Sequence, residues 1–165
     1  MTQSMTEFVY STYINSTPQK VWDAITTPEF ARQYWGHGNI SDWKPGSRWD
    51  HVNESTGKVM MTGEILESNP PRRLVLSWVS PDKVADRSEH SRVTFEIEAM
   101  EDIVRLNVIH DQLKDGSEMA KGISRGWPRV LSSMKTFLET GNPLNTWAGD
   151  TQSCASKEKA KQQAA

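Results

Sequence analysis

The stretch SRVTFEIEAMEDIVRLNVIHD, residues 91–111, carries the pattern that decides the fold. Apolar and polar residues alternate on both sides of Glu101 and Asp102, which suit a tight hairpin turn. Successive side chains of a strand point to opposite faces, so each segment has one apolar face. These faces carry Val93, Phe95, Ile97, Val104, Leu106, Val108 and His110. The stretch predicts an antiparallel hairpin with one buried and one solvated face.

Upstream segments continue this period of two and predict further strands of the same sheet. They are residues 8–14, the segment that starts at PGSRW, residues 59–65 and LVLSWV at 74–79. The polar stretch at 81–89 reads as an exposed loop. The inward parity of these strands includes Trp49, His51, Met61, Gly63, Leu74, Leu76 and Trp78.

Two short helices are predicted after the first strand. In the first, Thr17 can act as N-cap, and Pro18 suits the first helical position. The second repeats this signal at Thr27 and Pro28. Its apolar stripe is predicted to contain Phe30, Tyr34 and Trp35.

A long helix is predicted after Gly116, because apolar residues recur with the helical period from Met119 to Leu138. Trp127 and Met134 belong to this stripe. Pro128 predicts a kink or restart near Gly126, since proline removes a backbone donor. The expected domain is residues 7–141, followed by a disordered polar tail at 142–165.

Composition excludes several classes of function. The net charge of -2 gives no field that would attract nucleic acid. The chain shows no signal peptide and no apolar run long enough to span a membrane, so we expect a cytoplasmic protein. The four histidines are scattered and the only cysteine is Cys154, so we expect no metal site and no cofactor.

Nine inward residues are the candidate ligand-binding residues of an apolar pocket between sheet and helix. Seven tryptophans are far above the roughly two that average usage gives, and they offer flat apolar surface. Simple core packing is the competing interpretation for each tryptophan and methionine. The candidates are Trp35, Trp49, His51, Met61, Trp78, Phe95, His110, Trp127 and Met134.

His51 and His110 are the inward polar groups that could anchor a ligand or act as a general base. No carboxylate or nucleophile at informative spacing supports a catalytic role, so we assign no catalytic residue. The competing interpretation is a buried histidine that is hydrogen-bonded to a neighbour.

The order of elements, read with TPQKVWDAITTPEFARQYWG, NPPRRLVLSW and GWPRVLSSMKTFLETG, resembles a known superfamily. It is similar to the SRPBCC (START-like) helix-grip domains, and among them to bacterial homologues of the activator of the heat-shock protein 90 ATPase (AHSA1-like). The resemblance implies an α+β, Bet v 1-like fold. A curved antiparallel sheet of about six or seven strands would wrap around the C-terminal helix, with two short helices after the first strand.

The leading hypothesis is that the chain binds a small hydrophobic ligand, of lipid, polyketide or aromatic type, as the superfamily does. One alternative, implied by the family name, is a co-chaperone role on a heat-shock ATPase in the stress response. A second alternative is a cyclase or hydratase that uses a pocket histidine. We expect a binding protein rather than an enzyme.

Overall fold

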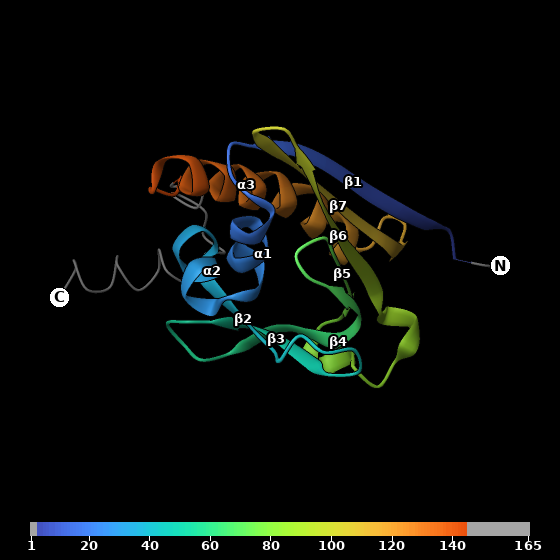
Figure 1. Cartoon of the computed structure of the whole chain (residues 1–165). Coiled ribbons are helices and arrows are strands. Elements are labelled where there is room, and N and C mark those ends of the chain that lie inside the picture. The colour runs from blue at the N-terminus through green and yellow to red at the C-terminus, as the bar shows by residue number, and fades with distance from the viewer. Residues whose placement is uncertain (1–2, 145–165) are drawn as a thin grey trace, which may run out of the picture.

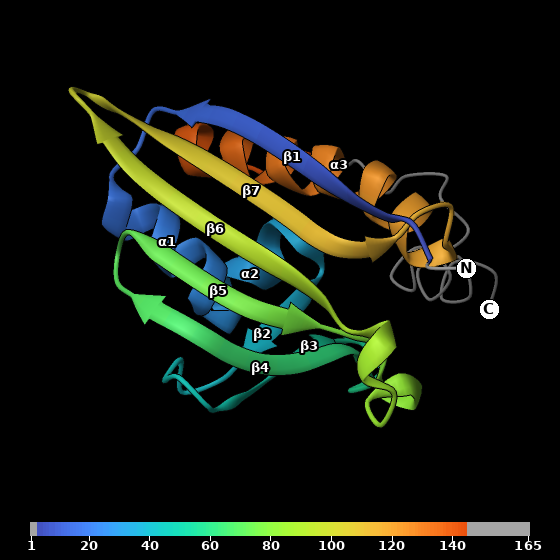
Figure 2. The same ribbon diagram turned by 90° about the vertical axis from the view of Figure 1, so that its right-hand side faces the viewer.

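The computed structural model describes residues 3–144 and contains one seven-stranded antiparallel sheet with three α-helices. The strands pair in the order β1-β7-β6-β5-β4-β3-β2. Figure 1 shows the sheet curving around the helices, and Figure 2 shows the three helices behind the sheet. This confirms the predicted helix-grip fold. The strands are β1 (Met5–Ile14), β2 (His37–Ile40), β3 (Arg48–Asn53), β4 (Val59–Asn69), β5 (Arg73–Trp78), β6 (Ser91–Met100) and β7 (Ile103–Lys114).

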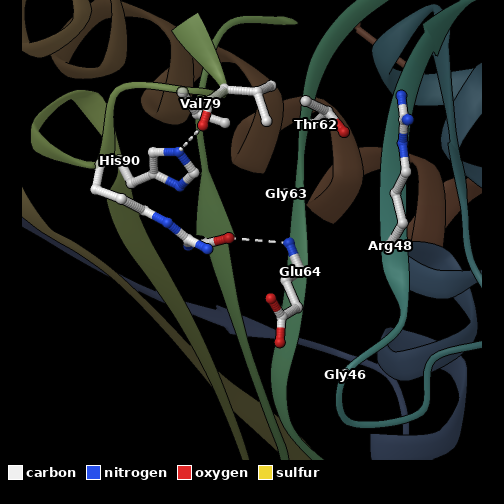
Figure 3. A pocket seen from close by; sticks show the side chains of 10 residues that line it. Gly46, Arg48, Thr62, Gly63, Glu64, Val79 and His90 are labelled. Atoms are coloured by element: carbon white, nitrogen blue, oxygen red, sulfur yellow. Dashed lines mark hydrogen bonds between the residues drawn. The ribbon is translucent and has the colours of Figure 1, made fainter.

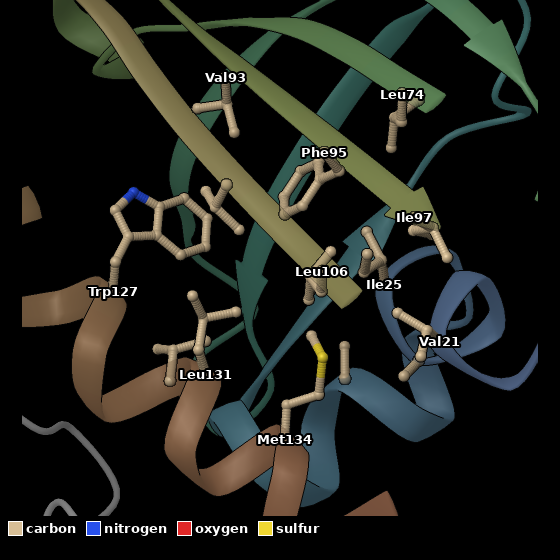
Figure 4. Close-up of a cluster of buried hydrophobic side chains, with 14 of the residues drawn as sticks. Val21, Ile25, Leu74, Val93, Phe95, Ile97, Leu106, Trp127, Leu131 and Met134 are labelled. Atoms are coloured by element: carbon tan, nitrogen blue, oxygen red, sulfur yellow. The ribbon is translucent and has the colours of Figure 1, made fainter. Parts of the chain in front are cut away.

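The core lies between the concave face of the sheet and the helices, and the alternation of the strands positions it. The central pair β6 and β7 matches the predicted hairpin, with Phe95 opposite Val108 and Val93 opposite His110. Their inward side chains are buried, as are Leu74, Leu76 and Trp78 of β5. Figure 4 shows Phe95 and Leu106 of this face on the side of Leu131 and Met134 of the long helix. The predicted buried faces of β5, β6 and β7 are therefore confirmed.

The two short helices are α1 (Pro18–Thr26) and α2 (Pro28–Trp35). The Thr17 hydroxyl accepts the backbone N–H of Lys20, so it caps α1 as predicted. Thr27 is the N-cap of α2 but makes no side-chain cap bond. The predicted stripe of α2 was wrong at Phe30, which is 41% exposed, because Ala31 takes the buried position.

The long helix α3 (Glu118–Thr140) covers the concave face. The Ser117 hydroxyl caps its start by accepting the N–H of Ala120, and Gly141 ends it in the left-handed conformation. Pro128 lies inside one continuous helix. The helix therefore does not restart there.

Three expectations about local structure change. The first strand begins at Met5 rather than at Phe8, and the short strand β2 was not predicted. The segment 81–89 is exposed as expected, yet it forms two 3-10 turns, η1 (Pro81–Lys83) and η2 (Arg87–Glu89). The expected tail lies outside the described residues from 145 onward, so it stays a prediction.

The sheet has a seam between β4 and β5, at Gly63. Ile65 pairs with Leu76, and the next pairing is the isolated bridge between Thr62 and Val79. Backbone groups between these two pairs form hydrogen bonds with side chains instead of with the neighbouring strand. The indole Nε1 of Trp49 donates to the carbonyl of Ser77 at 2.8 Å, and the Ser77 hydroxyl accepts the N–H of Glu64 at 2.9 Å. Side-chain groups thus replace ladder bonds along this seam.

Candidate functional site

Six aromatic rings from six elements form a continuous cluster inside the grip, which we call the aromatic cluster. Trp35 of α2 stacks near His51 of β3 with ring centroids 4.5 Å apart, and it lies 5.6 Å from Trp127 of α3. Trp78 of β5 lies 5.8 Å from Trp127. Distances of this size are typical of attractive aromatic pairs. The members are Trp35, His37, His51, Trp78, His110 and Trp127.

A chain of hydrogen bonds fixes the protonation state of His110 at the buried end of the cluster. The indole Nε1 of Trp127 can only donate, and it donates to His110 Nδ1 at 3.1 Å. The proton of the neutral ring must therefore be on Nε2, which lies 2.7 Å from the Ser91 hydroxyl. Ser91 in turn donates to the carbonyl of Trp78 at 3.1 Å. Every polar atom in this series of hydrogen bonds, from the Trp127 indole to the Trp78 carbonyl, has a partner.

Burial keeps both inward histidines neutral. Desolvation lowers the pKa of His110 to about 3, although the nearby Asp111 carboxylate opposes the shift. Desolvation, with a smaller contribution from the charge of His37, lowers the pKa of His51 to about 3 as well. Neither ring carries charge at neutral pH.

The same geometry argues against Ser91 and His110 as a nucleophile and its base. A base must present a lone pair to the hydroxyl, but Nε2 of His110 presents an N–H. The Ser91 proton points instead to the Trp78 carbonyl. This pair therefore holds the core together and does not activate a nucleophile.

We expect nitrogen-15 NMR spectra to show His110 as the Nε2–H tautomer across pH 5 to 8, because Trp127 donates to Nδ1. The one-bond proton coupling should appear on Nε2 alone. The variant Trp127→Phe removes the donor and should allow the other tautomer. Observation of an Nδ1–H in the unaltered protein, or of titration within this pH range, would contradict the assignment.

The open end of the cluster is held by polar groups that the sequence did not reveal. Asn39 of β2 is buried and donates from Nδ2 to the carbonyl of Ile25 at 2.9 Å. Its Oδ1 lies 2.7 Å from Nδ1 of His51. His37 is half-buried, and its Nδ1 lies 3.2 Å from the carbonyl of Trp35. Asn39, His37 and Ser91 were missed because their roles depend on contacts between distant segments.

One buried donor in the cluster has no partner among the described residues. The indole Nε1 of Trp78 makes no hydrogen bond, while the Trp78 side chain is 94% buried. An unpaired buried donor costs about 1–3 kcal/mol. A group that supplied an acceptor here would recover this energy.

The other predicted site residues surround the cluster, with one exception. Trp49 lies 5.2 Å from Trp78, and Phe95 lies 5.8 Å from Trp127, measured between ring centroids. Met61 is half-buried and pairs with His51 across the β3–β4 ladder. Met134 is the exception, because it is buried further along α3 than Trp127, beside Val21 and Ile25 (Figure 4).

Two hollows lie on the outer face of the sheet and have charged walls. One, of about 240 Å³, lies between the sheet and the 3-10 segment, with Arg48, Glu64 and His90 around it (Figure 3). The other, of about 390 Å³, has Val75 and Thr94 in its floor. Ion pairs such as Arg92 with Asp111 form its walls. Neither hollow is lined by the aromatic cluster.

Comparison with models of protein families shows the family to which the chain belongs. The family model described as "Activator of Hsp90 ATPase homolog 1-like protein" (AHSA1) matches residues 15–139. The chain belongs to the AHSA1 family. In this AHSA1-family protein the match covers α1, α2, all strands after β1, and nearly all of α3.

Solved structures share the AHSA1 fold. The Aha1 dimer from Colwellia psychrerythraea is 17% identical, covers 82% of this chain and 98% of its own, and gives a TM-score of 0.69. ChR145 from Cytophaga hutchinsonii is 29% identical, with 84% and 96% coverage and a TM-score of 0.65. PFC0360w, an HSP90 activator from Plasmodium falciparum, is 20% identical, with 80% and 95% coverage and a TM-score of 0.65. No curated protein matches the chain.

Among the described residues of this AHSA1-family chain, no helix has the length and apolarity needed to cross a membrane.

Proposed function

We propose that this AHSA1-family chain binds a small, largely apolar molecule at the aromatic cluster. The observation that carries the proposal is the unpartnered indole N–H of Trp78, which is buried among aromatic rings. Native proteins leave few buried donors unpaired, so such a group points to a missing acceptor. A ligand with an apolar ring and one acceptor would match both the rings and the donor.

Entry to the cluster would be through its half-buried members. Trp35, His37 and Met61 are partly exposed, whereas Trp78, His110 and Trp127 are buried. Trp35 and Met61 side chains can change rotamer without breaking a hydrogen bond that the structure records, and methionine is particularly adaptable. Their displacement would open a path toward Trp78.

Titration with 2-acetylnaphthalene, followed by proton–nitrogen-15 NMR, tests this proposal. We expect saturable shifts of the Trp35, Trp78 and Trp127 indole signals, with the Trp78 N–H moving downfield as it gains an acceptor. Trp22 of α1 makes no ring contact with the cluster, and its signal serves as the internal control. The variant Trp78→Phe should weaken binding about 10-fold, equivalent to one hydrogen bond.

Shifts confined to surface residues, or equal binding by Trp78→Phe, would contradict this function. The stability of Trp78→Phe is measured in parallel by urea unfolding, so that loss of fold is not mistaken for loss of binding.

A second candidate is an interaction role on a heat-shock ATPase. The AHSA1 family description favours it, as does the description of the Plasmodium falciparum neighbour as an HSP90 activator. The test is the ATPase rate of the Hsp90 chaperone with and without this chain. An unchanged rate, together with no co-elution, would exclude the role.

A further inference from the structure

The two histidines at the open end of the aromatic cluster, His37 and His51, are both held with their proton on Nδ1. The Nδ1 of His37 faces the carbonyl of Trp35, which only accepts, so this nitrogen carries the proton. Its Nε2 has no hydrogen-bond partner among the described residues. Burial lowers the pKa of His37, although the bond to Trp35 opposes the shift, so the ring is neutral at pH 7.

The orientation of His51 is fixed through a relay of two bonds. Asn39 must point its amide nitrogen at the carbonyl of Ile25, because a carbonyl accepts only. Its oxygen therefore faces His51, and Nδ1 of His51 must donate to it. The remaining nitrogen, Nε2, is a lone pair without a partner among residues 3–144. His51 is buried and cannot rotate freely to exchange its two nitrogens.

The two rings lie together, with centroids 4.7 Å apart and planes inclined by 32°. Trp35 lies beside His51 with a centroid separation of 4.5 Å. This end of the cluster therefore offers two hydrogen-bond acceptors next to a flat apolar ring. No side chain of the aromatic cluster carries a charge at neutral pH.

The two acceptors, the apolar ring and the absence of charge in the cluster together favour some chemical groups of a ligand over others. A carboxylate would meet two lone pairs and no cation, so it would lose its water without compensation. An ammonium group could donate to these lone pairs and contact an indole face, but it would leave water with no carboxylate in the cluster to balance its charge. A neutral hydroxyl on an aromatic ring can donate to a histidine Nε2 while the ring stacks on Trp35.

We infer that the ligand of this site is a neutral hydroxyl-bearing aromatic molecule of the phenol class, recognised through donation of its hydroxyl to the Nε2 atom of His37, the half-buried acceptor at the open end. This inference rests on the proposed function and names the ligand class for it. Recognition by this acceptor should give strong discrimination, because an analogue without the donor would cover the Nε2 atom of His37 and leave it unpaired.

Binding of 2-naphthol and 2-methoxynaphthalene, measured by isothermal titration calorimetry and NMR, tests the inference. The two probes share the ring, and only 2-naphthol has a hydroxyl donor. We expect 2-naphthol to bind at least 10-fold more tightly and to shift the Nε2 resonance of His37. In His37→Phe the preference should fall below about 2-fold.

The control His90→Phe changes a histidine of the outer face and should keep the full preference. Equal affinities for the two probes would overturn the inference while the proposed function stands. If neither probe binds, the inference fails, and the proposed function fails as well only if 2-acetylnaphthalene does not bind either. Should His37→Phe unfold, the shift of the His37 Nε2 resonance in the unaltered protein decides the question, and its absence would also overturn the inference.

Discussion

Replacement of Gly63 by alanine is expected to lower the free energy of unfolding by about 4 kcal/mol, a loss confined to severe steric or packing defects. A Cβ at this position would lie 1.9 Å from the carbonyl oxygen of Ser77 and 2.6 Å from Nε1 of Trp49. The first of these is backbone, which cannot move aside without opening the seam. Since small domains are stable by about 5–15 kcal/mol, the variant should lose much of its stability.

The matched control is Gly122→Ala in α3. A Cβ there meets nothing within 4 Å, and alanine is about 1 kcal/mol better than glycine inside a helix. Urea unfolding of both variants, followed by circular dichroism, gives the comparison. If Gly63→Ala stays within about 1 kcal/mol of the unaltered protein, the close approach of Trp49 and Ser77 does not constrain this position.

Acid is expected to destabilise the protein strongly between pH 7 and pH 5, by about 4 kcal/mol in total. His51 and His110 have a pKa of about 3 when folded, well below the ordinary value of 6.5. In this range the two histidines of the unfolded chain therefore take up protons that they do not bind in the folded chain. The stabilisation is complete above pH 6.5 and is lost as the pH falls toward 3. His37, whose pKa is also lowered, acts in the same direction.

Urea unfolding at half-unit steps between pH 7.5 and pH 5 measures this slope. The exposed carboxylates with lowered pKa, such as Glu118 and Glu139, lose their stabilising contribution only at lower pH, so this window isolates the histidines. The variant His51→Gln should halve the loss, to about 2 kcal/mol. A flat profile over the same range would mean that the two imidazoles are accessible to protons in the folded protein.

The sheet was predictable from sequence to the extent that its pattern is local. The alternation of residues 91–111 placed Phe95 and His110 on the buried face, because strand parity needs only neighbouring residues. The strand β2 was not predictable in this way. Its four residues, HGNI, have little β-branched content, and β3 and α2 hold the strand in place.

The candidate site was predictable in its rings and not in its polar partners. Strand parity placed Trp78 and His51 in the interior, and the helical apolar stripe placed Trp127 there. The structure brings the three together in one cluster. The tautomer of His51 depends on Asn39, which lies 12 residues away along the chain. No local spacing signals such a relay, because it exists only after β2 pairs with β3.

The seam at Gly63 also divides the cooperativity of the sheet. The sub-sheet of β2, β3 and the first half of β4 joins the rest through β4 itself, the bridge at Thr62 and the side chains of Trp49 and Ser77. A break in continuous main-chain pairing lets one part open while the other stays closed. Amide hydrogen exchange would therefore occur in two units with separate opening free energies. His37 and His51 lie in the sub-sheet of β2 and β3, and its separate opening would give small molecules a route inward without global unfolding.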